Sequence, residues 1–131
     1  QIKQESSITM LFISHDLNVV HYFSDEVAVM YMGKIVEMAK TAELFKSPKH
    51  PYTGLLLSSA PKIRGRHQAA SVQRAAHRAR LSAHFGDIPS PIDIPSGCTF
   101  HPRCPEKMDI CDKETPELKD CGGRLVACHL Y

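Results

Sequence analysis

Residues 8–17 read ITMLFISHDL, and this stretch decides the fold class. Its β-branched and aromatic residues surround an unbroken apolar centre, which predicts a strand over residues 8–14 that is buried on both faces. Asp16 suits the cap of a helix of about two turns that follows the strand. Three apolar residues of that helix recur at a spacing that predicts a core-facing side: Leu17, Val20 and Phe23.

His15 is the candidate catalytic residue. A strand that ends in Ser-His-Asp before a helix presents its last side chains where open α/β sheets contact their ligands. An imidazole there can donate a hydrogen bond to a γ-phosphate oxygen or accept one from an attacking water, and either stabilises charge in phosphoryl transfer. The local pattern is equally consistent with a structural hydrogen bond at the end of a strand.

The chain after this stretch predicts a hairpin and two short helices. Residues 26–32 and 34–38 are apolar strands separated by a glycine turn. Thr41 is the predicted N-cap of a helix over residues 42–45, and Pro51 suits the first turn of the next helix. One stripe of that helix is predicted to face the core: Tyr52, Leu55, Leu56 and Ser59.

Several segments together resemble one family of ATPases. Residues 11–17, LFISHDL, resemble the last core strand and switch histidine of ABC-transporter ATPases, and residues 27–37 resemble the two strands that follow it. Residues 50–53, HPYT, resemble the C-terminal extension of the oligopeptide, dipeptide and nickel importers, and residues 86–91 and 95–98 are similar to the rest of that extension. The implied fold is α/β: the C-terminal edge of an ABC ATPase domain, followed by a small cysteine-rich tail dominated by loops.

This resemblance implies a C-terminal portion of the ATP-binding subunit that powers peptide or nickel import. ATP and Mg²⁺ would lie between two such subunits, with His15 on the γ-phosphate. The implied partners are a second ATP-binding subunit and the transmembrane permease subunits, at the cytoplasmic face of the inner membrane. The chain contains no Gly-x4-Gly-Lys-Ser/Thr loop and no carboxylates that would hold magnesium, so no ATP hydrolysis is expected from it alone. An alternative is an interaction module that carries a metal cluster and has no ATPase activity.

Five cysteines lie between residues 98 and 128, and the first 97 residues contain none. Their odd number and the lack of an export signal favour a reduced, metal-holding site over disulfides. Four of them have wide spacings, which are compatible with a tetrahedral zinc or with an iron–sulfur cluster: Cys98, Cys104, Cys111 and Cys128. Spacing alone leaves zinc and cluster open, and four reduced cysteines without metal are the plainest alternative.

The resemblance implies a [4Fe–4S] cluster, because some of the importer ATPases carry one in a similar tail. The implied ligands are Cys98, Cys104, Cys111 and Cys128, whereas Cys121 is expected to be a free thiol. His101 and His129 stand beside ligands and could replace a cysteine or donate a hydrogen bond to one. A structural role is the simplest for the cluster, because the tail has few apolar residues of its own.

The chain divides by composition into residues 1–61, 62–86 and 87–131. The middle segment has six Lys or Arg and no acid, and is interpreted as a basic, partly helical linker. RNA or lipid binding there is the weaker alternative: no aromatic residue precedes Phe85, and the formal net charge of +2 does not indicate a nucleic-acid partner. No apolar run is long enough to span a bilayer. An unpaired strand at residues 8–14 would expose an apolar face, so the isolated chain is expected to self-associate.

Overall fold

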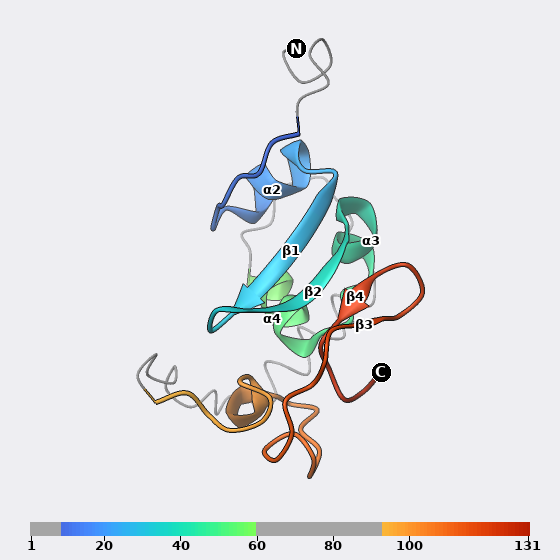
Figure 1. Cartoon of the computed structure of the whole chain (residues 1–131). Coiled ribbons are helices and arrows are strands. Elements are labelled where there is room, and N and C mark those ends of the chain that lie inside the picture. The colour runs from blue at the N-terminus through green and yellow to red at the C-terminus, as the bar shows by residue number, and fades with distance from the viewer. Residues whose placement is uncertain (1–8, 60–92) are drawn as a thin grey trace.

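An antiparallel hairpin forms the centre of the structure, a computed structural model that describes residues 9–59 and 93–131 (Figure 1). Strand β1 (Glu26–Tyr31) pairs with β2 (Lys34–Lys40), as the apolar pattern predicted. Met32 and Gly33 connect them with φ of 47° and 78°, so both turn residues are in the left-handed region that favours tight hairpins. The ladder is irregular between Val29 and Met30.

The tail adds two short strands to this hairpin. β3 (Lys119–Asp120) and β4 (Leu125–Val126) form an antiparallel pair, and β4 also pairs with β2, so the strand order is β1-β2-β4-β3. The prediction of a tail dominated by loops is correct for most of it but missed these strands. Two-residue strands carry too little side-chain pattern to be found by alternation.

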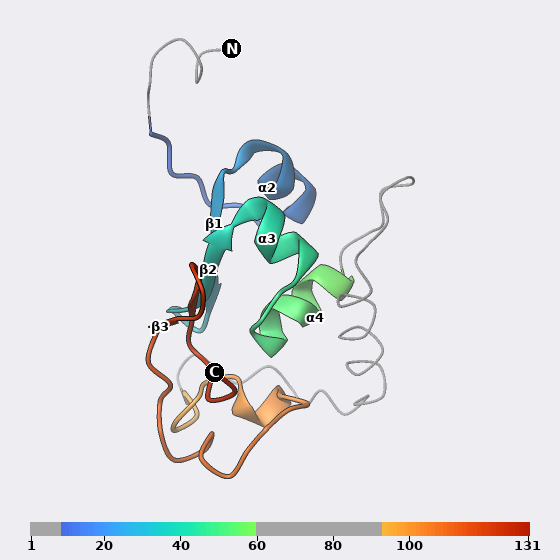
Figure 2. The same cartoon turned by 90° about the vertical axis from the view of Figure 1, so that its right-hand side faces the viewer.

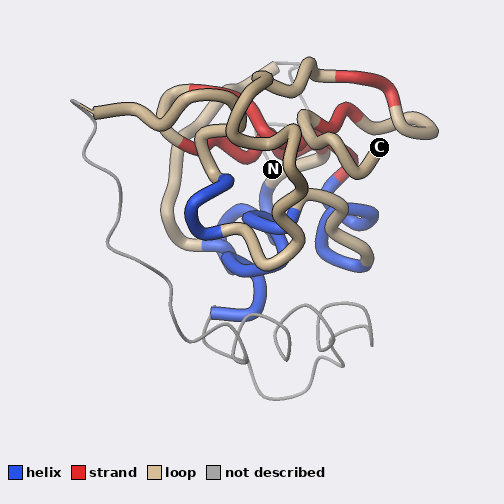
Figure 3. The backbone as a smooth tube through the Cα atoms, turned by 90° about the horizontal axis from the view of Figure 1, so that it is seen from below, coloured by secondary structure: helices blue, strands red, loops and turns tan. Residues whose placement is uncertain are grey.

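Three helices lie on one side of the sheet, as Figures 2 and 3 show. They are α2 (Leu17–Phe23), α3 (Thr41–Lys46) and α4 (Pro51–Ser59), and a 3-10 turn, η1 (His101–Arg103), belongs to the tail. Thr41 is the first residue of α3 and not its cap, because its hydroxyl donates a hydrogen bond to the Ser24 carbonyl at 2.7 Å. No helix in the two described stretches is long and apolar enough to cross a membrane.

The face that α4 buries differs from the predicted stripe. Thr53, Gly54 and Leu57 are buried. Three residues of the predicted stripe are only partly buried against the core: Tyr52, Leu55 and Leu56. The difference arises because the tail packs on this helix as well as the hairpin does, and a single amphipathic pattern cannot report two contacting surfaces.

The core combines residues of the hairpin and the helices with residues of the tail. Its centre is Phe100, whose side chain is fully buried. Its ring lies 5.2 Å from the ring of Tyr31 on β1, 5.4 Å from that of Tyr52 on α4 and 5.8 Å from that of His50 just ahead of α4. Aromatic pairs at such distances stabilise beyond the area that they bury. Hairpin, α4 and tail therefore share one hydrophobic core.

The predicted strand over residues 8–14 is wrong for its described part, because residues 9–14 form no strand. Leu11 and Ile13 are 93% and 96% exposed. A strand needs a neighbour for its backbone hydrogen bonds, and within the described residues no strand pairs with this segment. Phe23 is also 61% exposed, so only Leu17 and Val20 of the predicted helix face are partly covered. The predicted linker over residues 62–86 lies outside the described residues.

Candidate functional site

His15 lies on the exposed turn that leads into α2. The Asp16 side chain caps this helix, accepting hydrogen bonds from the amides of Asn18 at 2.8 Å and Val19 at 3.4 Å. The Asp16 amide in turn donates to the Ser14 hydroxyl at 3.0 Å. Asp16 is thus the cap, as predicted, and the His15 side chain is exposed. Its catalytic role stays a prediction.

Two of the four predicted cysteine ligands are held side by side by the backbone. The Cys98 amide donates to the Cys111 carbonyl at 2.8 Å. Gly97 makes this approach possible: its φ is +68°, and a Cβ there would lie 2.5 Å from the Cys111 carbonyl oxygen. The Thr115 hydroxyl donates to the Gly97 carbonyl at 3.1 Å and closes the loop. A glycine is therefore required directly before the first cysteine.

Backbone amides point at the sulfur atoms. The Met108 amide donates to the Cys111 sulfur at 3.4 Å. Backbone amides also lower the thiol pKa of Cys98, Cys104 and Cys128: those of Phe100 and His101 for the first, of Glu106 for the second and of Leu130 for the third. Hydrogen bonds to sulfur favour the thiolate and tune the potential of a bound iron–sulfur cluster.

The four thiols lie within electrostatic reach of one another. Burial raises the pKa of Cys104 to about 12, opposed by the Glu106 amide and reinforced by the thiols of Cys128, Cys98 and Cys111. Burial likewise raises the pKa of Cys128, opposed by the Leu130 amide and reinforced by Cys98 and Cys111, with the Glu37 carboxylate adding to it. Each charge would repel the others, so all four thiolates together are stable only beside a positive centre.

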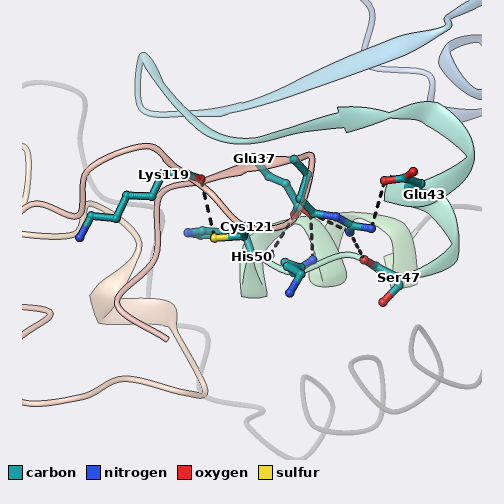
Figure 4. A network of polar contacts seen from close by, with 8 residues as sticks. Glu37, Glu43, Ser47, His50, Lys119 and Cys121 are labelled. Carbon is teal, nitrogen blue, oxygen red and sulfur yellow. Dashed lines mark hydrogen bonds and ion pairs between the residues drawn. The ribbon is translucent and has the colours of Figure 1, made fainter. Parts of the chain in front are cut away.

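The fifth cysteine stands apart from these four. The Cys121 thiol donates to the Lys119 carbonyl at 3.7 Å, at the turn between β3 and β4 (Figure 4). It is not among the causes that shift the pKa of Cys98, Cys104 and Cys128. All five cysteines are free thiols. The thiols of Cys98, Cys104, Cys111 and Cys128 interact electrostatically with one another. Their assignment as ligands, with Cys121 left out, stays a prediction.

The donor set fits a thiolate-bound group in its chemistry. It offers four partly or fully buried thiols, and the Met108 amide donates a hydrogen bond to the Cys111 sulfur. Among residues 9–59 and 93–131, no three His, Cys, Asp or Glu side chains converge as a site for a metal ion. Neither neighbouring histidine is placed as a substitute ligand. His101 Nδ1 donates to the Cys98 carbonyl at 2.9 Å, and His129 Nε2 lies 2.9 Å from the Glu114 carbonyl oxygen.

The buried His50 side chain contacts the segment that carries the cysteines. The His50 ring is 2% exposed and packs on Phe100, which lies between two of the cysteines. Its Nδ1 accepts a hydrogen bond from the Tyr52 amide at 3.1 Å, which places the ring proton on Nε2. Burial lowers the pKa of His50 to about 4, so the ring is neutral at pH 7. The prediction that His50 packs in the core and caps α4 agrees with this environment.

A buried carboxylate joins the strand, the helix and the tail, and sequence analysis missed it. Glu37 on β2 is fully buried, and its two oxygens accept hydrogen bonds from the amides of Lys49 and His50, each at 2.9 Å (Figure 4). Arg124, from the tail, lies 3.8 Å from the same carboxylate. Glu37 follows two apolar residues in a predicted strand, and a charged residue at a core position of a strand is the one signal that could have marked it.

Comparison with known proteins agrees with the resemblance. Residues 36–111 match the family described as oligopeptide/dipeptide transporter, C-terminal region. The oligopeptide transport ATP-binding protein AppF of Bacillus subtilis is 47% identical over the whole chain, which covers 38% of that protein. The dipeptide transport ATP-binding protein DppF of Escherichia coli is 42% identical over 97% of the chain, which covers 35% of that protein. The chain therefore spans about a third of the length of these relatives.

Proposed function

The chain belongs to the family of C-terminal regions of oligopeptide/dipeptide transporter ATP-binding subunits, and from that premise we propose that it serves in the ATP-binding subunit of a peptide importer. Nickel is the alternative cargo. The observation that carries the proposal is that one chain contains both the switch sequence around His15 and the family's C-terminal region, over its whole length aligned with such subunits. ATP and Mg²⁺ would be held mainly by the portion that precedes this region in the relatives.

His15 is the proposed γ-phosphate contact. Asp16 caps α2 and thereby fixes the turn that carries His15, so the imidazole is presented at a helix start without being used in its own fold. One donated hydrogen bond would stabilise charge on the transferring phosphoryl group. The partners would be a second ATP-binding subunit, across the ATP, and the permease subunits at the cytoplasmic face of the membrane.

A chimaera tests this role of His15. The upstream two-thirds of B. subtilis AppF, joined to this chain, should hydrolyse ATP. Loss of one charge-stabilising donor in His15→Ala should lower kcat by about 10²–10³-fold. His77→Ala, a histidine substitution outside the switch sequence, is the matched control and should leave kcat unchanged. An active chimaera in which both variants hydrolyse ATP equally well would refute the role of His15. A soluble chimaera without activity in any form would favour the interaction module.

The proposed occupant of the cysteine site is a [4Fe–4S] cluster bound by Cys98, Cys104, Cys111 and Cys128. Support comes from their electrostatic proximity, from the amides directed at the sulfurs and from the resemblance of the tail. When bound, the cluster would supply the positive centre that the four thiolates need, and it would cross-link the loop after Gly97 to the strand β4. Zinc is the alternative occupant.

Metal analysis separates these occupants. On anaerobically purified protein, about four irons and four acid-labile sulfides per chain with a visible absorption band support the cluster. About one zinc without sulfide would retain the cysteine site as a structural zinc site. Cys104→Ser should remove most of the bound metal, whereas Cys121→Ser, the matched control, should not. Equal metal content in both variants would overturn the ligand assignment.

A further inference from the structure

Cys128, the last of the four candidate ligands, is positioned by a different part of the fold from Cys98 and Cys111. Cys98 and Cys111 share one loop and a direct backbone hydrogen bond of 2.8 Å. Cys128 lies two residues after β4, so its position depends on where β4 sits against β2. Only two residue pairs define that ladder, Glu37 with Val126 and Met38 with Leu125. The Ala127 amide adds one bond to the Val36 carbonyl at 2.9 Å. Pairing this short is marginal without further contacts.

Arg124 supplies those contacts directly before β4. Its guanidinium donates to the Ser47 carbonyl at 2.6 Å through Nη1 and to the Glu43 carboxylate at 3.4 Å through Nη2 (Figure 4). Nη1 also lies 3.8 Å from the Glu37 carboxylate. The side chain is only 11% exposed, so these charge-assisted contacts are poorly screened by solvent. The planar guanidinium contacts Glu37 on β2, Glu43 on α3 and Ser47, the C-cap of α3, and thereby fixes the position and direction of the chain that enters β4.

We propose that Arg124 is a positioning residue for the cysteine site: by holding β4 on β2, it places Cys128 opposite Cys98, Cys104 and Cys111. The inference rests on the proposed function of the tail as a thiolate site. It differs from a general stabilising role because Glu37 keeps its two amide partners, of Lys49 and His50, when Arg124 is removed. The hairpin and α4 therefore stay joined, and only the approach of Cys128 is loosened.

The test compares Arg124→Gln with Arg124→Lys and with Lys119→Gln in the full chain. Lys119 is an exposed cation on β3 of the same hairpin and serves as the matched control. After anaerobic reconstitution with ferrous iron and sulfide, iron release to an excess of chelator is followed by the loss of visible absorption. Groups that orient metal ligands typically contribute 10–100-fold to metal affinity. Arg124→Gln should therefore release iron about tenfold faster or more, Arg124→Lys should be intermediate, and Lys119→Gln should match the wild type.

Hydrogen exchange of the metal-free chain gives a second reading that is independent of the cluster. In Arg124→Gln the Ala127 amide, bonded to Val36, should exchange at least tenfold faster, while the Cys98 amide, bonded to Cys111, keeps its rate. Equal acceleration of both amides would mean general destabilisation and would overturn the positioning role, as would unchanged iron release. A wild-type chain that takes up no iron would overturn the cysteine site itself, a result distinct from a loaded site that ignores Arg124.

Discussion

Replacement of Phe100 by alanine should separate the tail from the hairpin. The side chain is fully buried, and its ring contacts Tyr31 on β1 and Tyr52 on α4 at 5.2 and 5.4 Å. Truncation of a buried phenylalanine costs about 3–5 kcal/mol, and each aromatic pair lost accounts for about 0.5–1.5 kcal/mol beyond area burial. Small domains have total stabilities of about 5–15 kcal/mol, so a loss of about 4 kcal/mol removes a large share of it.

The assay uses the optical and chemical groups that surround Phe100. The chain has no tryptophan, so tyrosine fluorescence, including that of Tyr31 and Tyr52, follows urea unfolding of the metal-free protein. Thiol reactivity is measured alongside, because Cys98 and Cys111 are buried beside Phe100 and should become accessible together. A drop of about 4 kcal/mol corresponds to a fall in Tm of about 15–30 °C for a domain of this size.

Two further variants make this prediction refutable. Phe23→Ala is the matched control, because that phenylalanine is 61% exposed and its removal should change stability by less than about 0.5 kcal/mol. Phe100→Leu keeps most of the volume and should cost about 1–2 kcal/mol, chiefly from the lost ring contacts. If Phe100→Ala unfolds within about 1 kcal/mol of the wild type and its thiols stay protected, the shared core described above is wrong.

Two other predictions concern the glycine before the cysteine loop and the buried histidine. Gly97→Ala should destabilise the chain by about 1–3 kcal/mol more than Gly122→Ala, measured by urea unfolding. Both glycines have positive φ, but only at Gly97 would a Cβ meet the Cys111 backbone, at 2.5 Å, so equal costs would contradict the close approach. Burial lowers the pKa of His50 from 6.5 to about 4, so between these values the unfolded chain binds a proton that the folded chain does not. The free energy of unfolding should therefore be highest above pH 6.5 and fall by up to about 3 kcal/mol as the pH drops toward 4. His50→Asn, which keeps an acceptor for the Tyr52 amide, should flatten this part of the pH profile. A variant profile parallel to that of the wild type would refute the assignment to His50.

Local chemistry made the hairpin and the helix starts predictable. Apolar segments on both sides of Gly33, the carboxylate of Asp16 and the fixed φ of Pro51 each act within a few residues, so their effect is visible in the sequence. The candidate ligands could be named from the sequence for a different reason: cysteine is rare, and its spacing in the tail can be read without knowing the fold. Their role as ligands stays a prediction. Thr41 shows the limit even locally, because its hydroxyl bonds the Ser24 carbonyl in place of capping α3.

The long-range contacts were not predictable, because they depend on which segments meet. Phe100 is one aromatic residue among several in the sequence, and only the fold places it between Tyr31 and Tyr52. Likewise, nothing in the sequence distinguishes Glu37 and Arg124 from other charged residues, and only the pairing of β2 with β4 brings them together.

The sequence by itself determined the family, through the residues around His15, the HPYT sequence and the cysteine spacing, because these depend on residue identity and short-range order. Tertiary structure alone decided that residues 9–14 pair with no strand of the described part of the chain, that the tail extends the hairpin's sheet and that four of the five thiols lie close enough to influence one another's charge. The physical reason is that strand pairing, burial and charge interactions are properties of pairs of segments, and no single segment of a chain carries them.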